Sequence, residues 1–150
     1  HTILNNVLDD CHYRFGQVWH VNCHAMPAHT AFSRSTRRNT GIQSFDFVLG
    51  DLDGTSCARD LRACIRDILG RLGYSVGIND PYKGVEIVRR YGCPGDNRHA
   101  IQLEINKALY MDETNGTPNR NYERLKSDLR ILTADIAAFV RESCIDMAAD

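Results

Sequence analysis

The stretch at residues 99–106, HAIQLEIN, constrains the fold of this chain more than any other segment. Successive side chains of a strand point to opposite faces of a sheet, and this stretch alternates accordingly. The apolar face would hold Ile101, Leu103 and Ile105. The opposite, polar face would hold Gln102, Glu104 and Asn106. Because buried polar groups need partners, the polar face must either meet solvent or line a pocket, and we favour the pocket.

The size and charge of the chain limit the classes of protein to which it can belong. Its 150 residues suffice for one domain with a hydrophobic core, and 43% hydrophobic with 25% charged residues is ordinary for a globular protein. The net charge of −1 argues against a nucleic-acid or membrane-surface partner. Apolar runs fall short of the about 20 residues that span a bilayer, and no signal peptide is evident. We therefore predict a cytoplasmic protein.

Cysteine spacing and the first residue give two further expectations. The six cysteines are irregularly spaced and form no CxxC pair, which favours free thiols over disulfides or a zinc cluster. The chain starts at His1, without a methionine and directly in a helical pattern. We expect the natural protein to begin upstream of this residue.

Helical and strand patterns alternate along the rest of the chain. An amphipathic helix is predicted at residues 2–15, where four apolar side chains recur at helical spacing: Ile3, Val7, Cys11 and Phe15. A second helix follows Thr55 or Ser56 and ends at Gly73, and a third is capped by Thr117, with Pro118 in its first turn. Strands are predicted at residues 17–23, 45–49, 75–79 and 99–106, and a polar loop at residues 28–45. This order predicts a single α/β domain over residues 1–150, with a mostly parallel or mixed sheet and flanking helices.

Three polar groups that follow predicted strands are candidates for chemistry. Ligands of α/β sheets bind beyond the carboxyl ends of the strands. His24, Asp51 and the segment at residues 79–84 each come just after a strand, so we expect them to converge. A histidine in such a place suits a divalent metal, and a carboxylate such as Glu104 suits a general base.

Structural interpretations of the same residues stay open at this point. His24 could be a hydrogen-bonded turn residue rather than a ligand. Glu104 could form a structural ion pair with Arg98 or Lys107. Neither alternative needs a substrate or a metal.

Five motifs occur in one order along nearly the whole chain: NCHAMP, FVLGDLDGTSC, GYSVGINDPYKG, EIVRRYG and RHAIQLEINKALYMDE. Together they resemble the N-formylglutamate amidohydrolase (deformylase) family, and the last motif is long and specific. Two residues depart from the family pattern. Ala25 stands where the family commonly has Ser, which could remove a hydrogen bond from the site. Val85 stands where the family has a second Gly, which could stiffen its loop and narrow the choice of substrate.

The resemblance implies a metal-dependent hydrolase with a fold similar to that of zinc carboxypeptidases and aspartoacylases, here truncated at the N-terminus. It implies hydrolysis of N-formyl-L-glutamate to formate and L-glutamate, in histidine degradation. His24 would be a ligand of the metal, expected to be Zn²⁺, and Glu104 would be the general base and acid. A catalytic zinc takes three protein ligands, so the others would precede this chain. We accordingly expect the chain to be the C-terminal portion of a longer amidohydrolase, inactive alone.

The substrate that the resemblance implies is a small molecule with two carboxylates, so cationic groups should line its pocket. The candidates for substrate binding are Arg89, Arg90, Arg98 and Lys83, with Asn79 and Tyr82 as polar contacts. Arg89 and Arg90 are otherwise most simply solvated. Two alternatives remain: an amidohydrolase that acts on another N-acyl amino acid, and a non-catalytic module that retains the fold.

Overall fold

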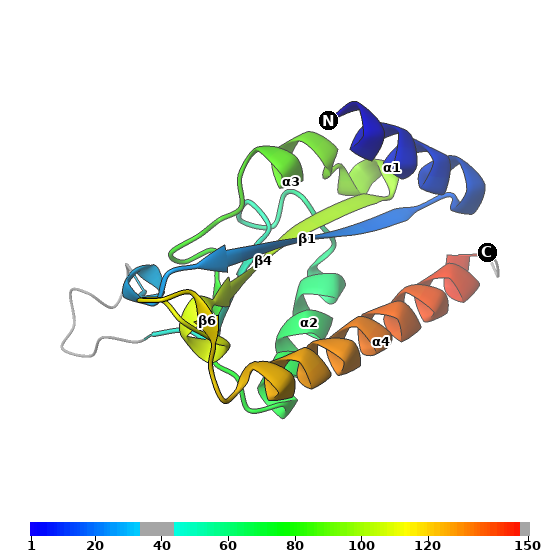
Figure 1. Cartoon of the computed structure of the whole chain (residues 1–150). Coiled ribbons are helices and arrows are strands. Elements are labelled where there is room, and N and C mark those ends of the chain that lie inside the picture. The colour runs from blue at the N-terminus through cyan, green and yellow to red at the C-terminus, as the bar shows by residue number, and fades with distance from the viewer. Residues whose placement is uncertain (34–43, 148–150) are drawn as a thin grey trace.

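A four-stranded mixed sheet organises the chain in the computed structural model, which describes residues 1–33 and 44–147 (Figure 1). The strands are β1 (Val18–Met26), β2 (Phe47–Gly50), β3 (Val76–Ile78) and β4 (Arg98–Asn106), and they lie in the order β1-β4-β2-β3. β1 pairs with β4 in parallel, as β2 does with β3, but β2 and β4 are antiparallel. The predicted α/β class with a mixed sheet and flanking helices is confirmed.

In the described part of the chain, four helices cover the two faces of this sheet. They are α1 (Thr2–Phe15), α2 (Arg59–Arg71), α3 (Glu86–Tyr91) and α4 (Tyr122–Met147). α2 and α4 lie on one face, and α1 and α3 lie on the other (Figure 1). Short 3₁₀ turns span Ala28–Thr30, Pro94–Asp96 and Lys107–Leu109, and a small hairpin joins β5 (Met111–Asp112) to β6 (Thr117–Pro118).

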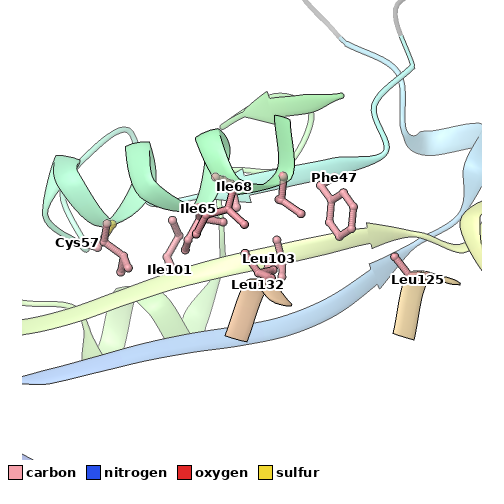
Figure 2. Close-up of a cluster of buried hydrophobic side chains, with 11 residues drawn as sticks. Phe47, Cys57, Ile65, Ile68, Ile101, Leu103, Leu125 and Leu132 are labelled. Carbon is pink, nitrogen blue, oxygen red and sulfur yellow. The ribbon is translucent and has the colours of Figure 1, made fainter. Parts of the chain in front are cut away.

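The main core lies between the sheet and the layer of α2 and α4 (Figure 2). Its fully buried members include Phe47, Leu49, Ile101 and Leu103 from the strands and Leu61, Ile65, Leu69 and Leu132 from the helices. The strand residues are those predicted for the apolar face of the strand at residues 99–106, together with the matching positions of β2. The alternation in the sequence therefore assigns the faces of the central strand correctly.

The predicted start of the last helix is wrong. The last helix begins at Tyr122, because Thr117 and Pro118 pair with β5 in a hairpin that turns at Gly116, with φ of +74°. The segment at residues 86–91, for which no element was predicted, is helix α3. The helix buries Val88 against the sheet side of the fold and leaves Arg89 and Arg90 exposed.

The apolar stripe of α1 lies on the outside of the described structure. Ile3 is 82% exposed, Val7 53% and Phe15 63%, although they recur at helical spacing. The helix is held by the adjoining face, where Leu8 packs with Val18 and residues of α3, and Cys11 of the stripe also packs against this cluster. Large apolar side chains exposed in a row are unusual on a protein surface.

Among the described residues, no helix has the length and apolar character needed to cross a membrane. The five described cysteines carry free thiols.

We expect Leu103→Ala to lower the free energy of unfolding by about 2–5 kcal/mol, because Leu103 is 2% exposed and its removal leaves a cavity in the main core. The measurement is urea denaturation of both proteins. The matched control is Ile131→Ala, whose side chain is 46% exposed and whose loss should change stability by at most about 0.5 kcal/mol. Equal effects of the two substitutions would contradict the assignment of the core.

Candidate active site

A line of polar side chains runs along the sheet face opposite the main core. We call it the polar row, and its members are His20, Asn22 and His24 of β1 and Gln102 and Glu104 of β4. The parallel register places His24 beside Glu104 and Asn22 beside Gln102. Because the pairing is in register, the even-numbered residues of both strands share one face. The row forms because polar residues occupy even-numbered positions in both β1 and β4.

The His24–Glu104 pair joins an accessible group to a sheltered one. The imidazole Nδ1 lies 3.9 Å from Glu104 Oε1, with 42% of the His24 side chain and 7% of the Glu104 side chain exposed. β1 extends to Met26, so His24 lies in the strand and not in a turn after it. A ligand that approaches from solvent can therefore contact the exposed imidazole and the carboxylate beside it.

Gln102 is the hydrogen-bond partner of Glu104. Its Nε2 donates to Glu104 Oε1 over 2.6 Å, and both residues are buried. Arg98, the ion-pair partner considered for Glu104, instead lies 2.8 Å from Asp9. The amide therefore orients the carboxylate, and no Lys or Arg of residues 1–33 or 44–147 forms an ion pair with it.

Three further polar atoms of the row are buried without a hydrogen-bond partner among the described residues. They are His20 Nδ1, Asn22 Nδ2 and Gln102 Oε1. Burial lowers the pKa of His20, which favours the neutral imidazole. Unpaired buried polar atoms are rare in proteins and mark places where water, a ligand or another polypeptide supplies the partner. The alternation of the strand predicted at residues 17–23 places His20 and Asn22 on one face, but neither was predicted as a site residue.

The predicted convergence of His24 with Asp51 and the segment at residues 79–84 is wrong in one respect. β2 and β3 run opposite to β1 and β4. Their carboxyl ends therefore lie at the other end of the strands from the carboxyl ends of β1 and β4. There the buried Asp51 carboxylate accepts from Asn79 Nδ2 over 2.6 Å and pairs with Arg62 over 2.7 Å. Asn79, a predicted substrate contact, thus fixes the turn after β2.

The segment after Asn79 nevertheless returns to the polar face. A Cβ at Gly50 would collide with the backbone nitrogen of Gly84, so these two glycines let the backbones touch. Gly50 pairs with Gln102, which brings residues 83–84 next to the polar row. Tyr82 packs against the cluster that contains Met26 and Val48, and its hydroxyl donates to Thr30. Val48 is the β2 residue that pairs with Glu104.

The predicted cationic contacts are spread over the surface. Lys83 is exposed and lies 2.6 Å from Asp53, Arg89 pairs with Glu86, and Arg90 lies over the Tyr91 ring. Arg98 is six residues from Glu104 along β4, about 20 Å at the usual rise of a strand. The structure brings Tyr82 and the Lys83 backbone towards the row, and it does not bring Arg98 there.

Metal donors are few at this site. Within residues 1–33 and 44–147, no group of three or more His, Cys, Asp or Glu side chains is placed to hold a metal ion. The row contains the imidazoles of His20 and His24 and the carboxylate of Glu104, and of these His24 and Glu104 lie 3.9 Å apart.

The fold has a close counterpart among proteins of known structure. The crystal structure of N-formylglutamate amidohydrolase from Ralstonia eutropha JMP134 superposes with a TM-score of 0.86 at 38% identity, over 95% of this chain and 50% of that one. The arrangement of sheet and helices thus matches that of half of an amidohydrolase structure.

The sequence profile of the N-formylglutamate amidohydrolase family matches residues 1–111, and the chain belongs to this family. N-formylglutamate deformylase from Pseudomonas putida is 31% identical over 115 residues, which are 76% of this chain and 41% of that protein. The deformylase of Pseudomonas aeruginosa is 42% identical over 69 residues, 45% of this chain and 26% of that protein. The chain spans half or less of the length of each of these relatives.

We expect Gln102→Leu to lower the free energy of unfolding by about 1–3 kcal/mol, because it leaves the buried Glu104 carboxylate without its donor. The matched control is the same substitution in a Glu104→Gln background, which removes the charge. A double-mutant cycle by urea denaturation should give a coupling energy of about 1 kcal/mol. Additive effects would show that the amide does not support the carboxylate.

Proposed function

We propose that this chain contributes the His24–Glu104 pair to an enzyme that hydrolyses N-formyl-L-glutamate to formate and L-glutamate. The observation that carries the proposal is the buried carboxylate, held by Gln102, beside an imidazole that is open to solvent. Family membership and the names of the relatives support the substrate. The role of such an enzyme in histidine degradation stays a prediction.

Glu104 performs the proton transfers of the proposed reaction. Its carboxylate accepts a proton from the water whose oxygen attacks the formyl carbon. When the bond between that carbon and the substrate nitrogen breaks, Glu104 returns the proton to the nitrogen, and the products are formate and an amine. Gln102 holds one carboxylate oxygen, so the other is oriented for this exchange.

A zinc ion is part of the expected mechanism, but the described residues do not fit one by themselves. A catalytic zinc takes three protein ligands, whereas no group of three such donors occurs among the described residues, and the row brings only the His24 imidazole beside the Glu104 carboxylate. When bound, such an ion would polarise the formyl carbonyl and acidify water. The zinc ion stays a prediction that needs donors from further polypeptide. The likeness to zinc carboxypeptidases and aspartoacylases also stays a prediction.

Residues of the segment 79–84 would bind the two carboxylates of the substrate. Tyr82 and Lys83 are the best placed of the predicted contacts, because this segment lies on the polar face beside Gln102. Lys83 would exchange its ion pair with the exposed Asp53 for a substrate carboxylate. The other four candidates support the proposal less, because of where they lie. Asn79 is bonded to the buried Asp51, Arg98 is about 20 Å from Glu104 along β4, and Arg89 and Arg90 are exposed on α3.

The test measures formate release by this chain alone and by a chimera in which it replaces the matching half of the Ralstonia eutropha relative. We expect Glu104→Gln to lower kcat of the chimera by about 10²–10⁴-fold, because the proton acceptor is lost. Glu123→Gln, at an exposed position of α4, is the matched control and should leave kcat unchanged. Full turnover by the Glu104→Gln chimera would refute the role of this carboxylate. Preference for N-acetyl over N-formyl substrates would favour the alternative amidohydrolase.

A further inference from the structure

The outer edge of β1 is open in the described part of the chain. Val18 donates its N–H to Asn97 on the β4 side, so the N–H and C=O groups of the odd-numbered residues point away from β4. These residues are Trp19, Val21, Cys23 and Ala25, and no described strand pairs with them. Natural edge strands are protected by being short or by carrying charges or proline. β1 has nine residues, VWHVNCHAM, and includes no Lys, Arg, Asp, Glu or Pro.

An apolar groove follows this open edge. It has a volume of about 730 Å³ and lies between β1 and α4. Its lining includes Trp19, Val21 and Cys23 of β1 and Leu132, Ile136 and Val140 of α4. The edge therefore offers backbone hydrogen bonds and an apolar surface in the same place.

The exposed stripe of α1 continues the same surface. Cys11 and Phe15 line the groove, and Val7 and Ile3 follow them at intervals of four residues along the helix. Apolar surface thus extends from one side of β1, where α1 lies, across the edge to α4 on the other side. A surface of this composition fits a partner that adds a strand to the sheet and packs on both layers.

We propose that this surface docks a β-strand, with its flanking apolar elements, from the polypeptide that corresponds to the part of the relatives outside the matched region. The size of that part supports the choice of partner, because the Ralstonia eutropha protein matches over only 50% of its length. The unpartnered Asn22 Nδ2 and His20 Nδ1 lie on β1 and would gain partners on docking. The docking surface itself does not depend on the proposed function. Only the ligands and the activity that docking would complete rest on that function.

The test mixes the ¹⁵N-labelled 150-residue chain with the other half of the Ralstonia eutropha relative, produced as a separate polypeptide. We expect a one-to-one complex in sedimentation velocity. Amide exchange at Trp19, Val21, Cys23 and Ala25 should slow by at least about tenfold, because their N–H groups become paired. The absence of a complex, or a homodimer of the chain alone with the same protection, would overturn the proposal.

Variants separate the proposed surface from the rest of the molecule. Val7→Glu and Phe15→Glu place a charge on the exposed stripe, and Cys23→Pro removes one outward N–H at a position where an edge strand tolerates proline. Each should weaken the complex by about tenfold or more, whereas Ile131→Glu, exposed on α4 outside the groove, should not. Unchanged binding by all three would overturn the proposal, with folding checked by the ¹⁵N spectrum of each free variant.

The readouts of this experiment do not depend on substrate. A complex that forms with the predicted protection but releases no formate would refute the proposed function and leave the docking surface intact. Activity of the covalent chimera without association of the separate polypeptides would do the reverse.

Discussion

The two-sided pairing of β4 is the constraint on which the rest of the structure depends. β4 lies between β1 and β2, and its alternation sends Ile101 and Leu103 into the main core and Gln102 and Glu104 to the opposite face. A shift of register by one residue would bury the carboxylate among leucines and expose the core, so the register is strongly fixed. The same register brings His24 beside Glu104. Core and site are therefore two consequences of one pairing.

Sequence reasoning predicted what depends on local periodicity. The faces of β4 follow from a clean period of two, and α1 and α2 follow from helical spacing and end near the predicted glycines. The direction of β2 could not be predicted, because three apolar residues and a glycine look the same in parallel and antiparallel pairs. The start of α4 was misplaced because Thr117 and Pro118 suit a helix N-terminus as well as a hairpin strand.

The site was predictable only in part for a similar reason. His24 and Glu104 were singled out by position and by family resemblance, but their adjacency is a matter of register, which a single sequence does not encode openly. Gln102 was seen as a polar strand residue, yet its donation to Glu104 depends on side-chain packing. The exposure of Val7 and Phe15 is the opposite of what an apolar stripe usually indicates, since periodicity identifies an apolar face but not what covers it.

β1 also places the only tryptophan of the chain where the fold can be observed from outside. Trp19 stacks on the His99 ring at 4.0 Å between centroids and meets Phe139 edge-on, while another part of it lines the groove beside α4. The fluorescence of an indole in this position depends both on the packing of α4 against the sheet and on the exposure of the groove to water. The molecule thus carries its own optical probe, and its emission spectrum can follow changes at the edge of β1 without any added label.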